Sequence, residues 1–187
     1  AATGIGVVGG THIATAADTL TAITHATGGI AIAETNAVTL SSVVANNGAI
    51  DITAGGTITA TAVSVTNAAA ANDIAITASA GDIAVGIIDA GSTGGITLEA
   101  TAGSVTDNNA TATADITCDN LAITALNSIG ASGNSLDTAV ASISLSSAGT
   151  TLTNDIYILE ADTVTISALS HGTSAGDVSI TTTDGPV

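Results

Sequence analysis

The sequence predicts an all-β protein, a right-handed parallel β-helix (β-solenoid) in which three short strands form each coil. Short alternating stretches of Ile, Val and Thr are separated by turns rich in Gly, Asn and Asp, which is typical of strands joined by tight turns. No stretch keeps an apolar period of about 3.6 residues for three turns, which argues against helices. A repeat of about 22 residues runs through the chain, and its 187 residues would make about eight such coils.

Pairs of apolar residues two positions apart define the repeat, and the first member of each pair is the predicted core position. A coil of a solenoid buries its inward side chains only against its neighbours, so equivalent positions form rows along the axis. In four repeats the pair continues into Thr or Ser followed by Ala, which places Ala inward where the chain begins to turn. The predicted core row consists of Ile30, Ile50, Ile74, Ile96, Leu121, Ile143 and Val164.

The regular coils are expected to span residues 30–167. Within each unit a second apolar site follows the first by 8 or 9 residues, and a third cluster closes the unit. Residues 1–29 are expected to form a glycine-rich N-terminal segment with one irregular coil, and residues 168–187 a long turn and a final strand. Neither end shows an amphipathic helix or a cluster of charges that would cap the stack. Both ends are therefore expected to be open sheet edges, ready to pair with another chain.

Three units carry a resemblance to a known family. They are GAIDITAGGTITA (48–60), NDIAITASAGDIAV (72–85) and GGITLEATAGSVTD (94–107). They resemble the repeats of filamentous-haemagglutinin-type adhesins, where Gly or Asp, alternating Ile, Thr and Leu, and a second Gly-containing turn recur. The resemblance covers roughly residues 30–167 and implies a secreted bacterial surface rod exported by an outer-membrane partner. The lack of Lys and Arg and of a recognisable secretion domain departs from that family, which leaves open a different filament-forming protein with convergent coils.

Charge excludes several classes of function. The chain has no Lys or Arg against 16 Asp plus Glu, a net charge of −16, and Tyr157 is its one aromatic residue. Nucleic-acid binding needs cations for the phosphates and usually aromatic rings for the bases, so no nucleic-acid partner is expected. An anionic membrane surface would repel the chain, and no apolar run is long enough to span a bilayer, so no membrane insertion is expected.

Catalysis is not expected either. Polysaccharide lyases and hydrolases also use β-helices, but grooves that cleave sugars normally add aromatic rings and cations to their paired carboxylates. Ice binding is a further alternative, because Thr-x-Thr pairs such as Thr57 and Thr59 can order water when they form a ladder. In the next coil the equivalent positions are Asp82 and Ala84, so the ladder is broken.

Carboxylates are the candidate metal ligands. Asp107, Asp115 and Asp119 lie close in sequence and near several Asn residues, and Ca²⁺ needs clustered oxygen ligands. Neither an EF-hand loop nor the glycine-rich nonapeptide pattern is present, so the alternative is that these are solvated turn residues. Diffuse association with Ca²⁺ or other cations is expected in either case, and no organic cofactor. The histidines are far apart in sequence and are expected to be surface or turn residues; they are His12, His25 and His171.

Four further features complete the candidates. Cys118 shares the inward parity of Ile116 and is expected to be a small core residue, since no cation is available to activate its thiol. Asn109 begins an Asn-Ala-Thr sequon, a candidate for N-glycosylation, with an unmodified side chain as the default. Tyr157 is expected to point outward. Residues 168–177 are the longest turn insertion and the place where a receptor site would lie.

The expected function is structural. We expect a subunit or segment of an extracellular filament or adhesin stalk, secreted and exposed at the cell surface, that assembles with itself through its open ends. Its partner would be a homopolymer of the same chain or a longer chain of the same repeat. The chain begins at Ala1, which suggests a processed chain or a segment of a longer one. The alternative is an adhesin module that binds a carbohydrate or receptor, such as a glycan of the host or surface.

Overall fold

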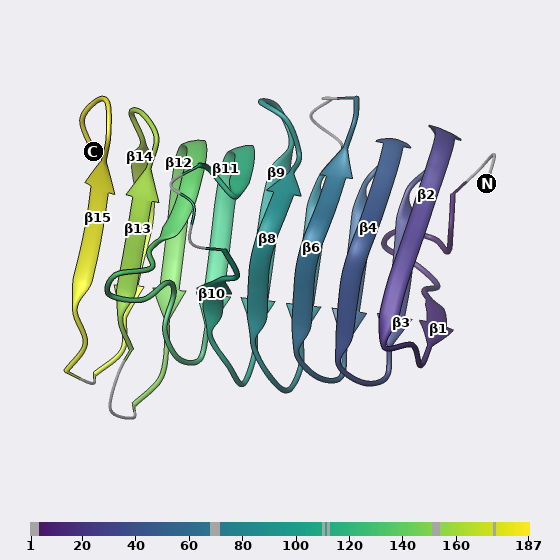
Figure 1. The fold of residues 1–187 in the computed structure, drawn as a ribbon, viewed down its shortest axis with the longest axis horizontal. Helices are drawn as coiled ribbons and strands as arrows, with labels where there is room; N and C mark the ends of the chain where they lie inside the picture. The colour runs from purple at the N-terminus through teal and green to yellow at the C-terminus, as the bar shows by residue number, and fades with distance from the viewer. Residues whose placement is uncertain (1–3, 68–71, 110, 112, 151–153, 174) are drawn as a thin grey trace.

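The chain folds as a β-solenoid of about seven turns, a single parallel stack of strands whose coils recur about every 22 residues. The computed structural model describes residues 4–67, 72–109, 111, 113–150, 154–173 and 175–187. The coils follow one another along the long axis, with the N-terminal and C-terminal coils at opposite ends (Figure 1). Among the described residues, no helix is long and apolar enough to cross a membrane.

One side of the solenoid consists of the strands that begin each repeat. Ile, Val and Thr alternate with small residues there, and the burial alternates with them, as expected for strands with one buried face. Two strands on this side, β11 and β12, are longer because they continue directly from the preceding side. In order along the stack they are β1 (Ile13–Thr15), β3 (Ile30–Glu34), β5 (Ile50–Ala54), β7 (Ile74–Ala78), β9 (Gly95–Ala100), β11 (Ile116–Ala125), β12 (Leu136–Ser147) and β14 (Thr165–His171).

The other two sides are formed by strands that bend at a corner. In β6 the alternation changes phase at Thr61 and Ala62, two successive residues that are not buried, so Ile58 and Val63 point inward from different sides. This bend joins the second and third predicted strands of the unit. The strands of these two sides are β2 (Thr19–Thr27), β4 (Val38–Asn47), β6 (Ile58–Val65), β8 (Ile83–Asp89), β10 (Val105–Asp107), β13 (Ile156–Glu160) and β15 (Val178–Thr182). The shorter β10 and β13 show no change of phase.

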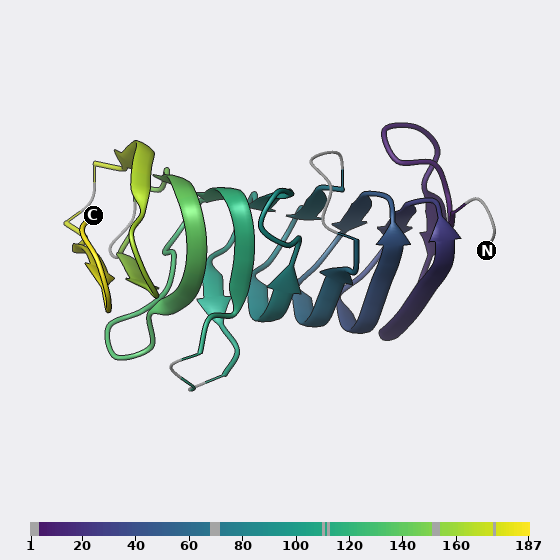
Figure 2. The same ribbon diagram turned by 90° about the horizontal axis from the view of Figure 1, so that it is seen from above.

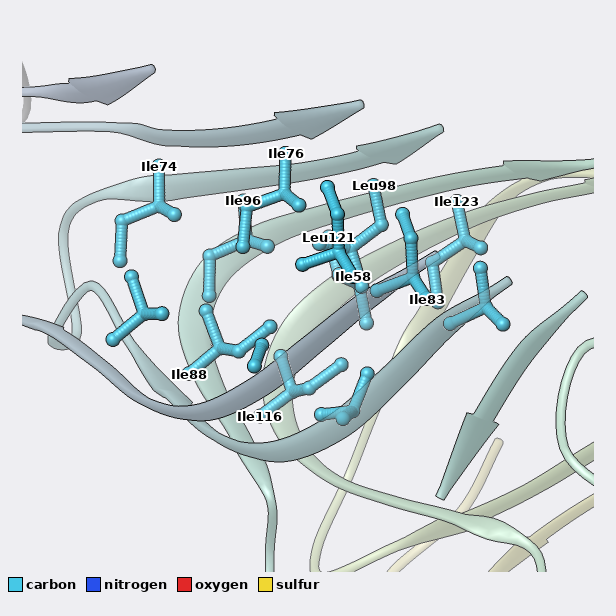
Figure 3. Close-up of a cluster of buried hydrophobic side chains, with 14 of the residues drawn as sticks. Ile58, Ile74, Ile76, Ile83, Ile88, Ile96, Leu98, Ile116, Leu121 and Ile123 are labelled. Carbon is cyan, nitrogen blue, oxygen red and sulfur yellow. The ribbon is translucent and has the colours of Figure 1, made fainter. Parts of the chain in front are cut away.

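The core is a narrow column of aliphatic side chains. Ile74 and Ile96 on the first side point toward Ile88 and Ile116 on the facing side, and all four are buried (Figure 3). The sheet register aligns the first-side residues one above another as Cα partners from coil to coil. This row runs through Ile30, Ile50, Ile74, Ile96, Leu121 and Ile143.

Val164 does not continue that row, so its predicted place is wrong. The Cα partner of Ile143 is Ile166, and the register then shifts so that Ser144 pairs with Ala168. The shift leaves Ser167 as an extra residue, whose hydroxyl donates a hydrogen bond to the Ile143 carbonyl oxygen at 2.9 Å. A β-bulge of this kind cannot be read from apolar spacing, because Val164 and Ile166 fit the alternation equally well.

The corner after the first side is packed with small residues. Ala54, Ala78, Ala100 and Ala125 are consecutive Cα partners, and all are buried, as their parity predicts. Gly55 follows the first of them, and a Cβ atom at Gly55 would lie 2.0 Å from the Thr35 carbonyl oxygen. Small side chains at this corner therefore let one coil approach the next at strand spacing.

Replacing Ala78 by Leu is expected to lower the free energy of unfolding by about 1–3 kcal/mol, because the Ala row above and below leaves no space for a larger side chain. Urea denaturation would measure the change. Thr77→Leu is the matched control, since Thr77 faces away from the core on the same strand, and its effect should stay within about 0.5 kcal/mol. Equal losses for the two variants would contradict tight packing of the Ala row.

Candidate functional site

The N-terminal end of the solenoid leaves core positions uncovered. Strands β1 and β2 each pair with one neighbour only in the described part of the chain, so their outer edges are free. Ile13 is the Cα partner of the buried Ile32 and therefore lies in an inward row, yet it is 46% exposed. Ile5 and Leu20 lie in inward rows as well and are only partly buried against the core. This end therefore exposes apolar core side chains and unpaired strand edges together.

The C-terminal end has the same character with different residues. Strands β14 and β15 have a single strand partner each among the described residues. Leu169 pairs with the buried Leu145 and is 46% exposed, and Val178 pairs with the buried Ile156 and is 44% exposed. Ile166 and Ile180 are partly buried and pack against the core. At both ends of the stack, rows of apolar side chains that are buried in its middle are therefore exposed to solvent.

A buried glutamate fixes the N-terminal coil to the second coil. Glu34 stands in the row that Ala occupies in the next four coils. Its Oε2 accepts hydrogen bonds from the Thr15 hydroxyl at 2.7 Å and the Ala17 amide at 2.9 Å, and its Oε1 accepts from the Thr35 amide at 2.9 Å. Burial acts to raise the pKa of Glu34, but these bonds and a further one from Asn36 outweigh it, so the pKa lies below the ordinary 4.5.

A second buried glutamate lies near the C-terminal end. Glu160 occupies a row that holds Ile88 and Ile116 earlier in the stack, followed by Thr138. Its Oε2 accepts a hydrogen bond from the Thr138 hydroxyl at 2.5 Å, and its Oε1 accepts from the Val140 amide at 3.1 Å. The two glutamates replace apolar core residues by hydrogen bonds to an adjacent coil, a feature that sequence reasoning missed.

An acidic cluster lies on the flank of the C-terminal half. One carboxylate oxygen from each of Asp107, Asp115 and Asp137 lies within 4.8 Å of the others, and this is the one such group of three ligands in the described part of the chain. Asp107 ends β10, Asp115 precedes β11, and Asp137 is the second residue of β12. Two connections project from the solenoid here, before β11 and before β12 (Figure 2). Asp115 and Asp137 are only 2% and 6% exposed.

The contacts of the cluster come mainly from Asn109. Its main-chain amide donates to Asp107 Oδ1 at 2.6 Å, and its side-chain amide donates to Asp115 Oδ1 at 2.6 Å. Asp115 Oδ2 is buried and accepts no hydrogen bond. Burial raises the pKa of Asp115 to about 7, with the charges of Asp107 and Asp137 adding to it against the Asn109 bond, and burial and Asp107 also raise the pKa of Asp137. These carboxylates are thus crowded and poorly compensated.

The sequence identified two of these three residues. Asp107 and Asp115 come together as candidate ligands, whereas Asp119 lies outside the cluster and accepts a hydrogen bond from its neighbour Asn120 at 2.6 Å. Asp137 was missed. The signal for it is the repeat itself, because Asp137 follows Asp115 by 22 residues and so stands one coil further along.

The histidines lie outside that cluster. His12 Nε2 lies 3.0 Å from Asp51 Oδ2, which is the one ion-pair contact found among the described residues. His25 is exposed on β2, and His171 Nε2 lies 2.5 Å from the Asn154 carbonyl oxygen.

The remaining candidate residues take part in local contacts. Cys118 is buried, and burial raises the pKa of its thiol to about 12, so the thiol is protonated at neutral pH. The Tyr157 hydroxyl donates to Asp177 Oδ2 at 3.3 Å. The side-chain nitrogen of the Asn109 sequon is engaged with Asp115 in the folded chain. Within the predicted turn at 168–177, β14 continues to His171, and Ser174 lies outside the described residues.

Comparisons with protein-family models, with curated proteins and with solved structures found no match to this chain. The resemblance to filamentous-haemagglutinin-type repeats is therefore carried by the three quoted units alone.

Replacing Glu34 by Gln is expected to destabilise the protein by about 1–3 kcal/mol at pH 7, because a neutral amide cannot accept all the hydrogen bonds that converge on the carboxylate. The lowered pKa means that the ionised carboxylate stabilises the fold above pH 4.5 and that this contribution is lost as the pH falls through the lowered pKa. The difference in unfolding free energy between the two proteins should therefore shrink in acid. A difference that stays constant from pH 7 to acid would contradict the role assigned to the charge.

Proposed function

We propose that this protein is a structural segment of an extracellular filament or adhesin stalk, and that its coils stack end to end on those of a second copy of the chain. One observation carries the proposal: the inward rows are buried along the solenoid but exposed at both of its ends. The exposed residues are Ile13 at the N-terminal end, and Leu169 and Val178 at the C-terminal end. A coil of this kind gains its stability from a neighbour, so an uncovered end is a surface to which another coil can add.

The C-terminal end of one chain can stack on the N-terminal end of another, whereas two identical ends would not repeat the contact between consecutive coils. All strands of the stack are parallel, so a C-terminal coil placed on an N-terminal coil repeats the contact that already joins consecutive coils. Two inward rows run along the first side: one begins at Ile13 and ends at Leu169, and the other begins at Ile5 and ends at Ile166. A head-to-tail contact between different surfaces leaves a free end after every addition, and it produces an open filament rather than a closed dimer.

The lateral surface supports an extracellular role. The outward positions are rich in Thr, Ser and Asp, and the chain offers trypsin no Lys or Arg at which to cleave. The net charge of −16 keeps rods apart in dilute salt, and solution cations would screen that repulsion. In this proposal the protein is secreted and exposed at the cell surface, its partner is its own kind, and it catalyses no reaction.

A groove on the first side favours the second candidate, a carbohydrate-binding module. It has a volume of about 490 Å³ and exposes carboxylate, amide and hydroxyl groups that could hydrogen-bond to sugar hydroxyls. The polar residues that line it include Asp73, Thr97, Asp119, Asn120 and Ser144. Saturable binding of a defined glycan by the single rod, lost in Asn120→Ala, would favour this function over the structural one.

Variants of the two ends test the stacking. Ile13→Asp and Val178→Asp each place a charge in one exposed end, and each variant alone should fail to form filaments in electron micrographs. Mixed together, they should form dimers in sedimentation velocity, because the intact C-terminal end of the first can bind the intact N-terminal end of the second. Their circular dichroism should match that of the unaltered chain.

Leu126→Asp is the matched control, since Leu126 is also an exposed apolar residue but lies on the lateral surface. This variant should assemble like the unaltered chain. End-to-end stacking is wrong if the unaltered chain remains a monomer, if either end variant still forms filaments, or if the mixture gives no dimers.

Assembly should increase with monovalent salt. Screening shortens the range of repulsion between the acidic rods from about 30 Å at 0.01 M to about 8 Å at 0.15 M, while the apolar end contact is little affected. Sedimentation velocity in NaCl, with a chelator present to remove divalent ions, would measure the size distribution. A distribution that does not change with salt concentration would count against charge repulsion as the limit on assembly.

A further inference from the structure

Uncompensated charge makes the acidic cluster unusual. Three carboxylates approach within 4.8 Å, and two of them are almost fully buried. The chain contains no Lys or Arg, and in its described part the one ion-pair contact is between His12 and Asp51. Buried like charges at this distance repel one another strongly unless a proton or a cation lies between them. Among the residues that the structure describes, no ion pair reaches this position.

Hydrogen bonds fix the positions of the carboxylate oxygen atoms in the cluster. Asn109 holds Oδ1 of both Asp107 and Asp115 through its main-chain and side-chain amides, which fixes the two carboxylates relative to each other. The backbone adds a second constraint, because the Asp115 amide donates to the Asp137 carbonyl oxygen at 2.9 Å and sets these residues one coil apart. Asp115 Oδ2 is left buried within the cluster with no hydrogen-bond partner. Asp115 Oδ2 is therefore a buried carboxylate oxygen that is available to a cation.

We propose that Asp107, Asp115 and Asp137 bind one Ca²⁺ ion on the flank of the solenoid. Ca²⁺ takes oxygen ligands at about 2.3–2.6 Å, so oxygen atoms on opposite sides of one ion lie about 4.6–5.2 Å apart, which matches a cluster contained within 4.8 Å. Ca²⁺ also accepts irregular coordination completed by water, and the half-buried Asp107 leaves the site open to solvent. Mg²⁺ demands near-ideal octahedral geometry at shorter distances and is expected to bind more weakly.

The bound ion would join three segments from successive parts of the stack. Asp107 belongs to β10, Asp115 directly precedes β11 and Asp137 belongs to β12, and the Asn134 side chain already donates to the Asp107 carbonyl oxygen at 3.3 Å. Ca²⁺ would therefore fasten the two projecting connections to the coils behind them. This site is independent of end-to-end stacking, because it lies on the flank and within one chain.

Calorimetric titration of the full chain with CaCl₂ tests the site. The protein is first stripped of divalent ions with a chelator and titrated in 0.15 M NaCl at pH 7.5, where diffuse association is screened. We expect one saturable site per chain with a dissociation constant of about 10⁻⁴–10⁻³ M, the range of extracellular calcium modules. Asp115→Asn should weaken it on the order of tenfold or more, because it removes one charged ligand. MgCl₂ should give a weaker isotherm.

Asp119→Asn is the matched control. It removes the same charge close by in sequence but outside the cluster, so its calcium isotherm should match that of the unaltered chain. Melting curves provide the second measurement: Ca²⁺ should raise the melting temperature of the unaltered chain and of Asp119→Asn, and raise that of Asp115→Asn less at the same Ca²⁺ concentration. Asp137→Asn repeats the test at a second ligand. The proposal is overturned if the unaltered chain shows no saturable site, or if Asp119→Asn loses as much affinity as Asp115→Asn.

Discussion

Each coil of this protein can bury its inward side chains only against another coil, and the rest of the structure follows from that constraint. A single coil has no interior of its own, so Ile, Leu, Val and Ala must recur in register for the column to stay dry. The interior is narrow, and aliphatic residues fill it without any Phe, Trp or Met. Stacking also requires glycine and alanine at the corner, because a larger residue there would separate the backbones of adjacent coils.

The interior changes character toward both ends. In the middle of the stack the corner row is Ala, whereas Glu34 occupies it near the N-terminal end and Ser147 near the C-terminal end. Glu160 and Thr138 likewise replace Ile in a facing row. An end coil has only one neighbour, so apolar burial stabilises it less, and hydrogen bonds donated to a buried carboxylate supply part of the missing stabilisation.

The fold could be predicted because its determinants are local and repeated. The spacing of Ile50, Ile74 and Ile96 places them on one side of consecutive coils, and alternation alone assigns their inward direction. Val164 was misplaced because the bulge at Ser167 separates the inward residues Ile166 and Leu169 by three positions, so a search for apolar pairs two positions apart selects Val164 and Ile166 instead. The buried glutamates were missed for a different reason: an acidic residue in an inward position reads as a turn residue until its hydrogen-bond donors are known.

The acidic cluster could be predicted from the sequence in part. Repeat arithmetic brings Asp115 and Asp137 together, because residues one period apart occupy adjacent coils, and the same arithmetic gives no reason to include Asp119. The burial of Asp115 and Asp137 could not be predicted from the sequence, because both residues occupy positions where side chains in other coils face solvent. Ile87, one coil before Asp115, is an example. Here both are buried, and Asn109 donates a side-chain hydrogen bond to Asp115. A chain without Lys or Arg has few groups that can neutralise buried carboxylates, so the compensation has to come from solution as a proton or a cation. A loosely held counterion suffices on the open surface, whereas the buried oxygen of Asp115 is fixed in position, which is why we propose a coordinated Ca²⁺ ion there.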